Sequence, residues 1–176
     1  EMLYESVVEI EERVHADGTV ETSLNLETAR PRLKKAYDDG IRAVAVVFMH
    51  GYRFPEHELA VAELAREIGF TQVSTSYETS PLGQLVSRGD TTVVDAYLSP
   101  LLRRYVDQVA SELGNTRLMF MQSNGGLTDA HLFQGKDAIL SGPAGGIVGA
   151  VETAEQAGFD RIISVDMGGT STDVAH

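Results

Sequence analysis

The hydrophobic and polar positions of this chain follow two different periods, which predicts alternating strands and helices. Residues 5–14 alternate with period two, the pair Asp17-Gly18 is typical of a hairpin turn, and the alternation resumes over 19–24. In chain order, we expect a β-hairpin over 5–24, a helix over 25–38, a strand over 43–49, a helix over 56–68, a strand over 72–76, a helix over 93–113, a strand over 117–121, a short helix over 128–133, a strand over 138–140, a helix over 147–157 and a strand over 161–165.

The first half of the chain carries the clearest signals. Asn25 suits the N-cap of a helix with Leu33 and Tyr37 on one face, although Pro31 blurs where this helix starts. The run 43–49 has no polar alternation, which predicts a central parallel strand buried on both faces. The helix that follows stops at Gly69.

The helix over 93–113 carries a long apolar stripe that should pack on the sheet. Its members are Val94, Tyr97, Leu98, Leu101, Leu102, Tyr105, Val106 and Val109. Pro100 should kink or split it. Strands that alternate with helices predict an α/β fold with a largely parallel sheet, and no linker or repeat divides the chain.

Composition narrows the classes of function. The chain has 176 residues with 26 acidic and 14 basic side chains, a formal charge of −12, and we therefore expect no nucleic-acid partner and no anionic membrane surface as a partner. No apolar run approaches the roughly 20 residues of a membrane span. The chain lacks cysteine and any export signal, which favours a soluble, cytoplasmic protein. Both ends fall within expected elements, so we expect a segment of a longer protein.

The residues most suggestive of chemistry follow the last expected strand. Gly168 and Gly169 let the backbone turn tightly and approach a ligand, and the hydroxyls of Thr170, Ser171 and Thr172 can donate hydrogen bonds to a phosphate. The flanking carboxylates of Asp166 and Asp173 suit Mg²⁺ and the orientation of a hydroxyl or water. From spacing alone, a plain hairpin turn fits this segment equally well.

This turn resembles the phosphate loop of the actin, sugar kinase and Hsp70 superfamily, in which an Asp-x-Gly-Gly-Thr turn surrounds ATP phosphates. A narrower resemblance covers nearly the whole chain: it is similar to the hydantoinase A and 5-oxoprolinase (hydantoinase/oxoprolinase) family, which includes N-methylhydantoinase A-like subunits. Six blocks in the family's order carry this resemblance: 12–14 with 17–18, 43–48 to 55–58, Arg88 with 91–92 and 96–97, 123–126, 141–146 and 166–175.

The resemblance implies part of a two-lobed, actin-like (ribonuclease H-like) fold, with a mixed sheet flanked by helices and an N-terminal β-hairpin. Residues 1–158 would form the later part of the first lobe and the connecting helix, and residues 159–176 the first strand and phosphate-loop turn of the second lobe. The family's other phosphate loop would lie upstream. ATP and Mg²⁺ are the implied cofactors, with Asp166 and Asp173 as the catalytic and metal-holding residues.

The implied reaction is the ATP-dependent opening of a cyclic amide, a hydantoin or 5-oxoproline, through phosphoryl transfer to the lactam carbonyl oxygen. A hydantoinase B-type subunit is the implied partner, and the isolated segment should be inactive. Two alternatives stay open: the ATP-using β subunit of an acetone carboxylase-type complex, and a non-enzymatic, nucleotide-responsive binding module. The substrate ring is not defined, because the residues that select it can lie outside 1–176.

Two further glycine clusters have both a binding and a structural interpretation. Ser123, Asn124, Gly125 and Gly126 follow a strand's carboxyl end, where ligands bind in open α/β sheets, and a plain tight turn is at least as good an interpretation. The second cluster, Ser141, Gly142, Gly145 and Gly146, precedes the expected helix 147–157. It can offer amides to an anion or allow close packing, and the resemblance favours nucleotide contact.

Other polar residues favour structural roles. A hydrogen bond in the turn for His50 and a place at the helix start for His57 fit better than metal ligation, because Val61 stands where a zinc motif needs its second histidine. Arg88 and Asp90 can pair with each other or reach a ligand, and we expect an exposed ion pair, which is the more common outcome for such neighbours. No P-loop and no dinucleotide fingerprint occurs.

Overall fold

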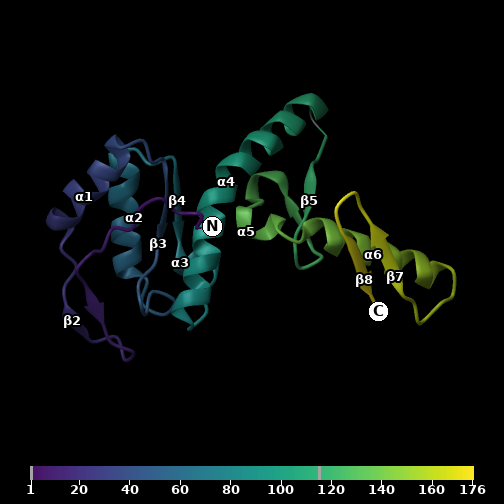
Figure 1. Cartoon of the computed structure of the whole chain (residues 1–176), viewed down its shortest axis with the longest axis horizontal. Helices are drawn as coiled ribbons and strands as arrows, with labels where there is room; N and C mark the ends of the chain where they lie inside the picture. The colour runs from purple at the N-terminus through teal and green to yellow at the C-terminus, as the bar shows by residue number, and fades with distance from the viewer. Residues whose placement is uncertain (1, 115) are drawn as a thin grey trace. The chain divides into compact units, whose positions relative to one another are not determined.

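The computed structural model describes residues 2–114 and 116–176. They form two compact units, unit 1 (Glu1–Leu102) and unit 2 (Arg103–His176), and Figure 1 labels most of their elements. Unit 1 contains β1 (Arg13–Val14), β2 (Val20–Thr22), α1 (Leu26–Asp38), β3 (Ala43–Val46), α2 (Glu56–Ile68), β4 (Gln72–Thr75), α3 (Ser76–Thr79) and the first part of α4 (Leu85–Leu113). Unit 2 continues with β5 (Met119–Met121), β6 (Leu127–Asp129), the 3-10 helix η1 (Ala130–Leu132), α5 (Gly135–Ala138), α6 (Ser141–Gln156), β7 (Ser164–Met167) and β8 (Thr172–Ala175).

The strands of the described residues pair two by two. Strands β3 and β4 are parallel, in a register that runs from Ala43 opposite Gln72 to Val46 opposite Thr75. The pairs β1–β2, β5–β6 and β7–β8 are antiparallel. The mixed α/β character is therefore confirmed, whereas these residues do not by themselves form the single, largely parallel sheet that the sequence predicts.

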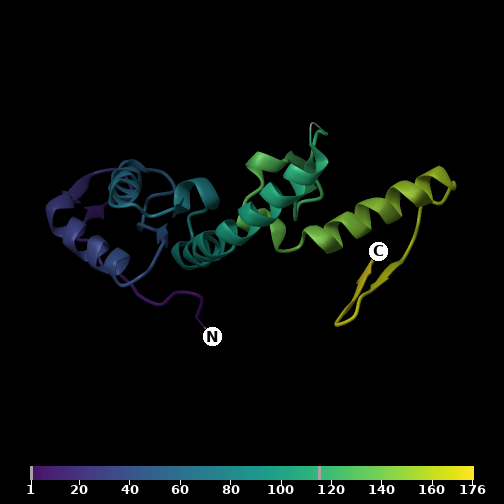
Figure 2. The same ribbon diagram turned by 90° about the horizontal axis from the view of Figure 1, so that it is seen from above.

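The N-terminal hairpin is shorter than its sequence pattern. Its turn is held by hydrogen bonds from the amide of His15 to the Thr19 carbonyl (2.8 Å) and from the amide of Thr19 to the Asp17 carboxylate (2.9 Å). Gly18 adopts φ +92°, which confirms the predicted turn. Only Arg13 and Val14 form β1, however, because β2 is three residues long, and Figure 2 shows the preceding residues as an extended segment without a partner strand.

Helix α1 begins where the capping chemistry predicts. The Asn25 side-chain oxygen accepts hydrogen bonds from the amides of Glu27 and Thr28, and the helix continues through Pro31. Its buried face carries Ala29 and Leu33.

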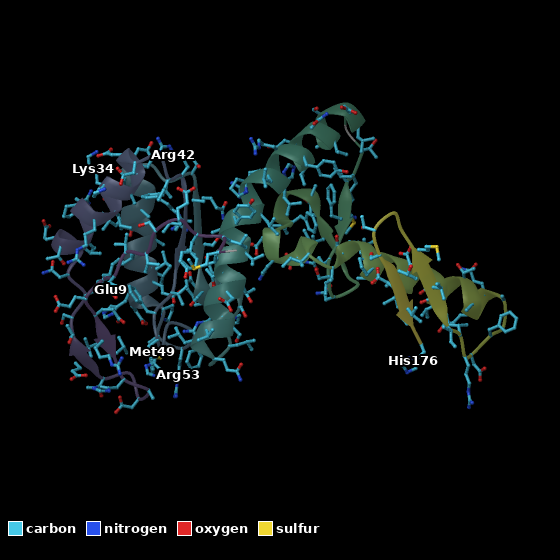
Figure 3. The ribbon with its side chains drawn as sticks, in the orientation of Figure 1. Glu9, Lys34, Arg42, Met49, Arg53 and His176 are labelled. Atoms are coloured by element: carbon cyan, nitrogen blue, oxygen red, sulfur yellow. The ribbon has the colours of Figure 1, made fainter. Side chains whose placement is uncertain are left out.

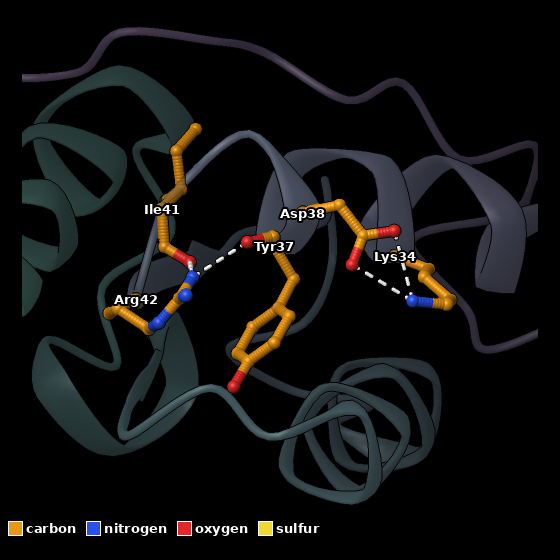
Figure 4. Close-up of polar contacts among 5 residues, drawn as sticks. All are labelled: Lys34, Tyr37, Asp38, Ile41 and Arg42. Carbon is orange, nitrogen blue, oxygen red and sulfur yellow. Dashed lines mark hydrogen bonds and ion pairs between the residues drawn. The ribbon is translucent and has the colours of Figure 1, made fainter.

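The side chain of an arginine holds the turn after α1 through bonds to two backbone carbonyls. Arg42 donates to the carbonyls of Tyr37 (2.6 Å) and Ile41 (2.9 Å), and its guanidinium lies 4.0 Å from the centre of the Tyr37 ring. Figure 4 shows these contacts beside the Lys34–Asp38 ion pair on the same helix. The cation–π contact and the two carbonyl bonds fix the path of the chain into β3.

The core of unit 1 lies between α1, α2 and β3, which neighbour one another in Figure 1. Helix α2 covers the expected range, and Gly69 ends it in the left-handed conformation at φ +116°. The buried apolar residues of this core are Ala29, Leu33, Val46, Val61, Leu64, Ala65 and Phe70. These side chains pack α1 and α2 against β3.

Strand β3 is less buried than its sequence predicts. Val46 is buried, but Ala43, Val44 and Ala45 are only half-buried. The reason is that β3 lines a cavity of about 580 Å³, together with Val93 and Tyr97 of α4 and residues of the N-terminal segment. The prediction of a strand buried on both faces was therefore wrong for the described residues.

Helix α4 differs from its prediction in extent and in the face that it buries. It starts at Leu85 and runs through Pro100 as one helix, so the alternative of a split helix is wrong. In unit 1 its buried positions are mostly polar: Arg88, Thr92, Asp95, Ala96 and Ser99. Tyr97 and Leu101 of the expected stripe are about half exposed. Polar side chains fill this face because they bond to one another and to β4.

That polar face is a connected hydrogen-bond network. The hydroxyl of Ser74 on β4 donates to the Asp95 carboxylate (2.7 Å) and accepts from the Gln72 amide (2.9 Å). The hydroxyl of Ser99 donates to the other Asp95 oxygen (3.2 Å). Buried polar groups that satisfy one another avoid the desolvation penalty, so a polar helix face can pack against a sheet.

Unit 2 corrects several expected boundaries. The segment predicted as a short helix over 128–133 contains the end of β6 and the 3-10 helix η1, and the predicted strand over 138–140 is absent, because α5 ends at Ala138. Helix α6 starts at Ser141, six residues before the predicted Ile147. The last predicted strand, 161–165, is shifted to Ser164–Met167 and is largely exposed instead of buried.

Candidate functional site

The glycine-rich segment after β7 forms the turn of a hairpin. Strands β7 and β8 pair in antiparallel register with Met167 opposite Thr172, and the Gly168 amide donates to the Ser171 carbonyl (2.9 Å) across the turn. A Cβ on Gly169 would meet no atom within 4 Å, so this side of the backbone is open. The turn therefore exposes its backbone and the Thr170 and Ser171 side chains.

The two aspartates of this segment face each other across the hairpin. Asp166 on β7 lies directly opposite Asp173 on β8, and both are exposed. Like charges at directly opposed positions of an antiparallel pair destabilise it, whereas a cation between them would reverse the sign of the interaction. Two carboxylates are ligands that suit Mg²⁺, which usually completes its shell with water and substrate phosphates.

Helix α6 lies against the same aspartate. A Cβ built on Gly146 would come 3.1 Å from Asp166 Oδ2, so a larger residue there would push this carboxylate away by a few tenths of an ångström. Ser141 to Gly146 belong to α6 itself instead of a preceding loop. Beyond the first turn, the amides of a helix donate to carbonyls of the same helix, so the amides of Gly145 and Gly146 are already bonded. The amides that stay free are those of Ser141 and Gly142 at the start of α6.

The turn after β5 supports the start of α6. Gly125 donates to the Gln122 carbonyl (2.9 Å) at φ +82°, and Gly126 donates to the Asn124 side chain (2.8 Å). The Ser123 hydroxyl donates to the Asp137 carbonyl (2.7 Å) and accepts from the Leu140 amide (3.0 Å). Residues 123–126 thus form a tight hairpin turn between β5 and β6 that also anchors the residue before α6.

Unit 2 therefore brings together three of the predicted segments. Asp166 touches α6 at Gly146, and Ser123 holds the backbone that enters α6. Over residues 2–114 and 116–176, no group of three or more histidine or acidic side chains is placed to hold a metal ion. A cation at Asp166 and Asp173 would accordingly need further ligands from water or phosphate.

A second cluster of charged residues lies in unit 1, and sequence reasoning missed it. Glu58, Ser76 and Arg88 are each fully buried. The Ser76 hydroxyl donates to Glu58 Oε1 (2.6 Å) and accepts from Arg88 Nε (2.9 Å), so it bridges a carboxylate and a guanidinium. The expected exposed ion pair of Arg88 with Asp90 was wrong, because the Arg88 side chain is directed into the protein.

The remaining bonds of this cluster go to the backbone. Glu58 accepts from the amides of Phe48 (2.9 Å) and Tyr77 (3.1 Å). A Cβ on Gly51 would overlap the Glu58 carboxylate, which explains a glycine there. The available sequence signal was a glutamate on the apolar stripe of α2, whose other buried members include Val61 and Ala65.

The two histidines of this region form structural hydrogen bonds, but the partner of His50 is Val14 of β1, whereas the sequence predicts a residue of its own turn. His50 Nδ1 lies 2.8 Å from the Val14 carbonyl oxygen, and His57 Nδ1 lies 2.7 Å from Glu12 Oε2. The His57 and Glu12 side chains are both largely buried. These bonds connect the N-terminal hairpin region to the loop after β3 and to α2.

Comparisons with known proteins match most of the chain. Residues 88–176 match the model of the hydantoinase/oxoprolinase family, and residues 1–69 match the model of its N-terminal region. A 5-oxoprolinase of Saccharomyces cerevisiae is 38% identical over 208 residues, covering 98% of this chain and 16% of the relative. Caprolactamase subunit alpha of Pseudomonas jessenii is 33% identical over 169 residues, covering 92% of this chain and 24% of that subunit. The chain thus spans a quarter or less of these relatives' length.

Two solved structures have the same fold over 94% of the chain. The crystal structure of the ATP-dependent caprolactamase from Pseudomonas jessenii matches with a TM-score of 0.82 at 33% identity. The match covers 25% of the caprolactamase chain. A nucleotide-free acetone carboxylase, from work on ATP-dependent acetone carboxylation, matches with a TM-score of 0.83 at 26% identity, again over 25% of its chain. Within the part of the chain that the structure describes, no helix is both long and apolar enough to cross a membrane.

Proposed function

The chain belongs to the hydantoinase/oxoprolinase family, and we propose that it is part of a longer, ATP-dependent enzyme that opens a cyclic amide. The observation that carries the proposal is the hairpin β7–β8, where Asp166 and Asp173 face each other beside the open Gly168–Gly169 turn. Relatives named 5-oxoprolinase and caprolactamase support the substrate class. Residues 1–158 would belong to the first actin-like lobe and its connecting helix, and 159–176 would begin the second.

The donor set of the hairpin fits Mg²⁺ and phosphate. The carboxylates of Asp166 and Asp173 would hold the ion, which when bound neutralises charge on ATP phosphate oxygens. The amide of Gly169 and the hydroxyls of Thr170, Ser171 and Thr172 would bind phosphate oxygens, while the Gly168 amide closes the turn through its bond to the Ser171 carbonyl. The remaining predicted contacts, at 123–126 and 141–146, would shape the nucleotide side of the site around α6.

The proposed reaction activates a poor electrophile. The lactam carbonyl oxygen attacks the γ-phosphorus of ATP, and ADP leaves with the bridging oxygen. Water then adds to the carbonyl carbon, the ring C–N bond breaks, and hydrolysis of the resulting acyl phosphate by a second water releases phosphate and the open amino acid. Hydroxyl and amide donors at the hairpin turn would orient the phosphoryl group for this transfer.

We propose a hydantoinase B-type partner subunit as well, supported by the name of the caprolactamase relative, which is an alpha subunit. The acetone carboxylase match favours one alternative reaction, in which the same activation serves a ketone and bicarbonate.

The test is ADP release by the complete protein with its co-purifying partner, offered hydantoin, 5-oxoproline, caprolactam, or acetone with bicarbonate. Cyclic-amide-dependent release is expected, and Asp166→Asn should lower it by about 100-fold or more. Asp160→Asn, an exposed aspartate of the same unit, is the matched control and should have no effect. Release only with ketone and bicarbonate would favour the carboxylase, and ATP binding without turnover would favour a binding module. Full activity of Asp166→Asn would contradict the site.

A further inference from the structure

The loops that leave β3 and β4 lie at one edge of unit 1. Because the two strands are parallel and in register up to Val46 and Thr75, their carboxyl ends meet at the same edge. In open α/β sheets, ligands bind at this edge. The loop after β3 runs to Phe54 and includes Met49 and Arg53, which Figure 3 labels at one end of this unit.

Arg88 holds both loops by their backbones. Its Nη2 donates to the carbonyls of Phe48 (2.6 Å) and Met49 (3.0 Å) after β3, and its Nη1 donates to the Leu82 carbonyl (2.5 Å) beyond β4. Charge-assisted bonds from a fully buried guanidinium fix the conformation of the loops. A fixed loop is what a binding site needs, because a loosely held contact residue loses most of its effect.

Tyr52 is the aromatic side chain that this arrangement positions. Its ring centre lies 5.3 Å from the Arg88 guanidinium carbon, and a Cβ on Gly83 would lie 3.8 Å from Tyr52 Cζ. The side chain is half-buried, so part of it faces the solvent at this edge. A tyrosine ring offers a flat apolar face together with a hydroxyl donor, which matches a small cyclic amide with a flat ring and a carbonyl acceptor.

We propose that Tyr52 contacts the cyclic amide at the carboxyl edge of β3 and β4, and that Arg88 is the positioning residue that holds Tyr52 and its loop. This inference rests on the proposed function, and it assigns the amide-binding side of the reaction to unit 1. Ser76 contributes by accepting from Arg88 Nε, and Glu58 by accepting from the Ser76 hydroxyl, so both hold Arg88 in place.

The test measures KM and kcat of the complete protein with its partner subunit for the cyclic amide that it opens. Tyr52→Ala should raise KM for the amide by about tenfold or more, with kcat lowered less and KM for ATP unchanged. Tyr52→Phe keeps the ring and removes the hydroxyl. Its KM for the amide should lie between the values of the unaltered protein and Tyr52→Ala. Tyr97→Ala, an about half-exposed tyrosine of α4, is the matched control and should leave all three constants unchanged.

Arg88→Lys tests the positioning role. One ammonium group cannot replace the planar fork that reaches Phe48, Leu82 and Ser76 together, so KM for the amide should rise as it does in Tyr52→Ala, while KM for ATP stays constant. Because Arg88 acts through Tyr52, the double variant should be no worse than the poorer single variant. Additive losses would overturn this role, since they would mean that Arg88 acts independently of Tyr52.

The outcomes separate this inference from the proposed function. If the unaltered protein opens a cyclic amide and Tyr52→Ala has an unchanged amide KM, the inference is overturned and the proposed function stands. If the unaltered protein shows no amide-dependent ADP release, both are overturned. If Tyr52→Ala does not fold, an unchanged amide KM in Tyr52→Phe and Arg88→Lys overturns the inference.

Discussion

Removal of the Ser76 hydroxyl is the sharpest test of the buried cluster in unit 1. This hydroxyl donates to Glu58 and accepts from Arg88, and all three side chains are fully buried. Ser76→Ala therefore leaves a carboxylate and a guanidinium each without one partner. Hydrogen bonds to charged groups contribute about 1.5–3 kcal/mol each, so the two losses should destabilise the local structure by about 3–6 kcal/mol.

Amide hydrogen exchange in the complete protein measures this loss where it occurs. The Phe48 amide donates to Glu58, so its exchange reports whether that carboxylate still holds the loop after β3. A local loss of about 3–6 kcal/mol corresponds to an exchange rate about 150-fold to 25,000-fold faster at Phe48. The Tyr77 amide, which donates to the other carboxylate oxygen, should accelerate as well.

Ser87→Ala is the matched control for the same chemical change. Ser87 is exposed and lies 3.4 Å from its acceptors on Gln84, so its loss should change exchange at Phe48 by less than about threefold. If the Phe48 amide exchanged as slowly in Ser76→Ala as in the unaltered protein, the expected loss of these two bonds would be refuted. That result would mean that Arg88 and Glu58 pair directly once the bridging hydroxyl is gone.

Three further predictions concern local structure. Gly51→Ala should destabilise the folded protein and lower its soluble yield, because its Cβ would overlap the buried Glu58 carboxylate and force it to shift. Gly149→Ala in α6, where a Cβ meets no atom within 4 Å, should be neutral or stabilising by about 0.5–1 kcal/mol. Asn25→Ala should destabilise α1 by about 1 kcal/mol, seen as faster exchange of the Thr28 amide. The Thr19 amide bond lowers the pKa of the Asp17 carboxyl below 3.8, so its contribution to the turn is present above that pH and lost as pH falls through the folded pKa, which a carboxyl NMR titration measures.

The parts of the fold that the sequence predicts well are those decided by neighbouring residues. The cap at Asn25, the turn at Asp17-Gly18 and the left-handed end of α2 at Gly69 each follow from the chemistry of one to three consecutive residues. No long-range contact is needed to form them. This is why α1, α2 and the first turn lie where the sequence places them.

The start of α6 shows why local signals also mislead. Ser141 to Gly146 contain glycines and Pro143, which usually indicate a loop, yet they form the first turns of the helix. Pro143 is tolerated there because the first amides of a helix have no partner within it. Of these glycines, Gly146 has a tertiary contact, because Asp166 approaches there, and sequence periodicity cannot reveal that contact.

The buried cluster was missed for a related reason. Ser76 lies 18 residues from Glu58 and 12 from Arg88, so no local motif connects them. A charged residue on an apolar helix face indicates that a partner exists without saying where it lies. The buried face of α4, with Arg88, Thr92, Asp95 and Ser99, repeats this pattern, and only the fold shows that α4 packs through polar side chains.

The buried cluster of Glu58, Ser76 and Arg88 and the exposed pair Asp166 and Asp173 differ in how their charges are compensated. This difference bears on what each group can do. Glu58 and Arg88 are buried but linked through Ser76, so their charges offset each other and the cluster can hold loops rigidly without any ligand. Asp166 and Asp173 face each other on an exposed hairpin, where two like charges oppose pairing. A cation would relieve that repulsion, which makes the hairpin the part of the chain whose stability should depend on a bound metal. The first cluster therefore suits a positioning role and the second a binding role, as the two proposals require.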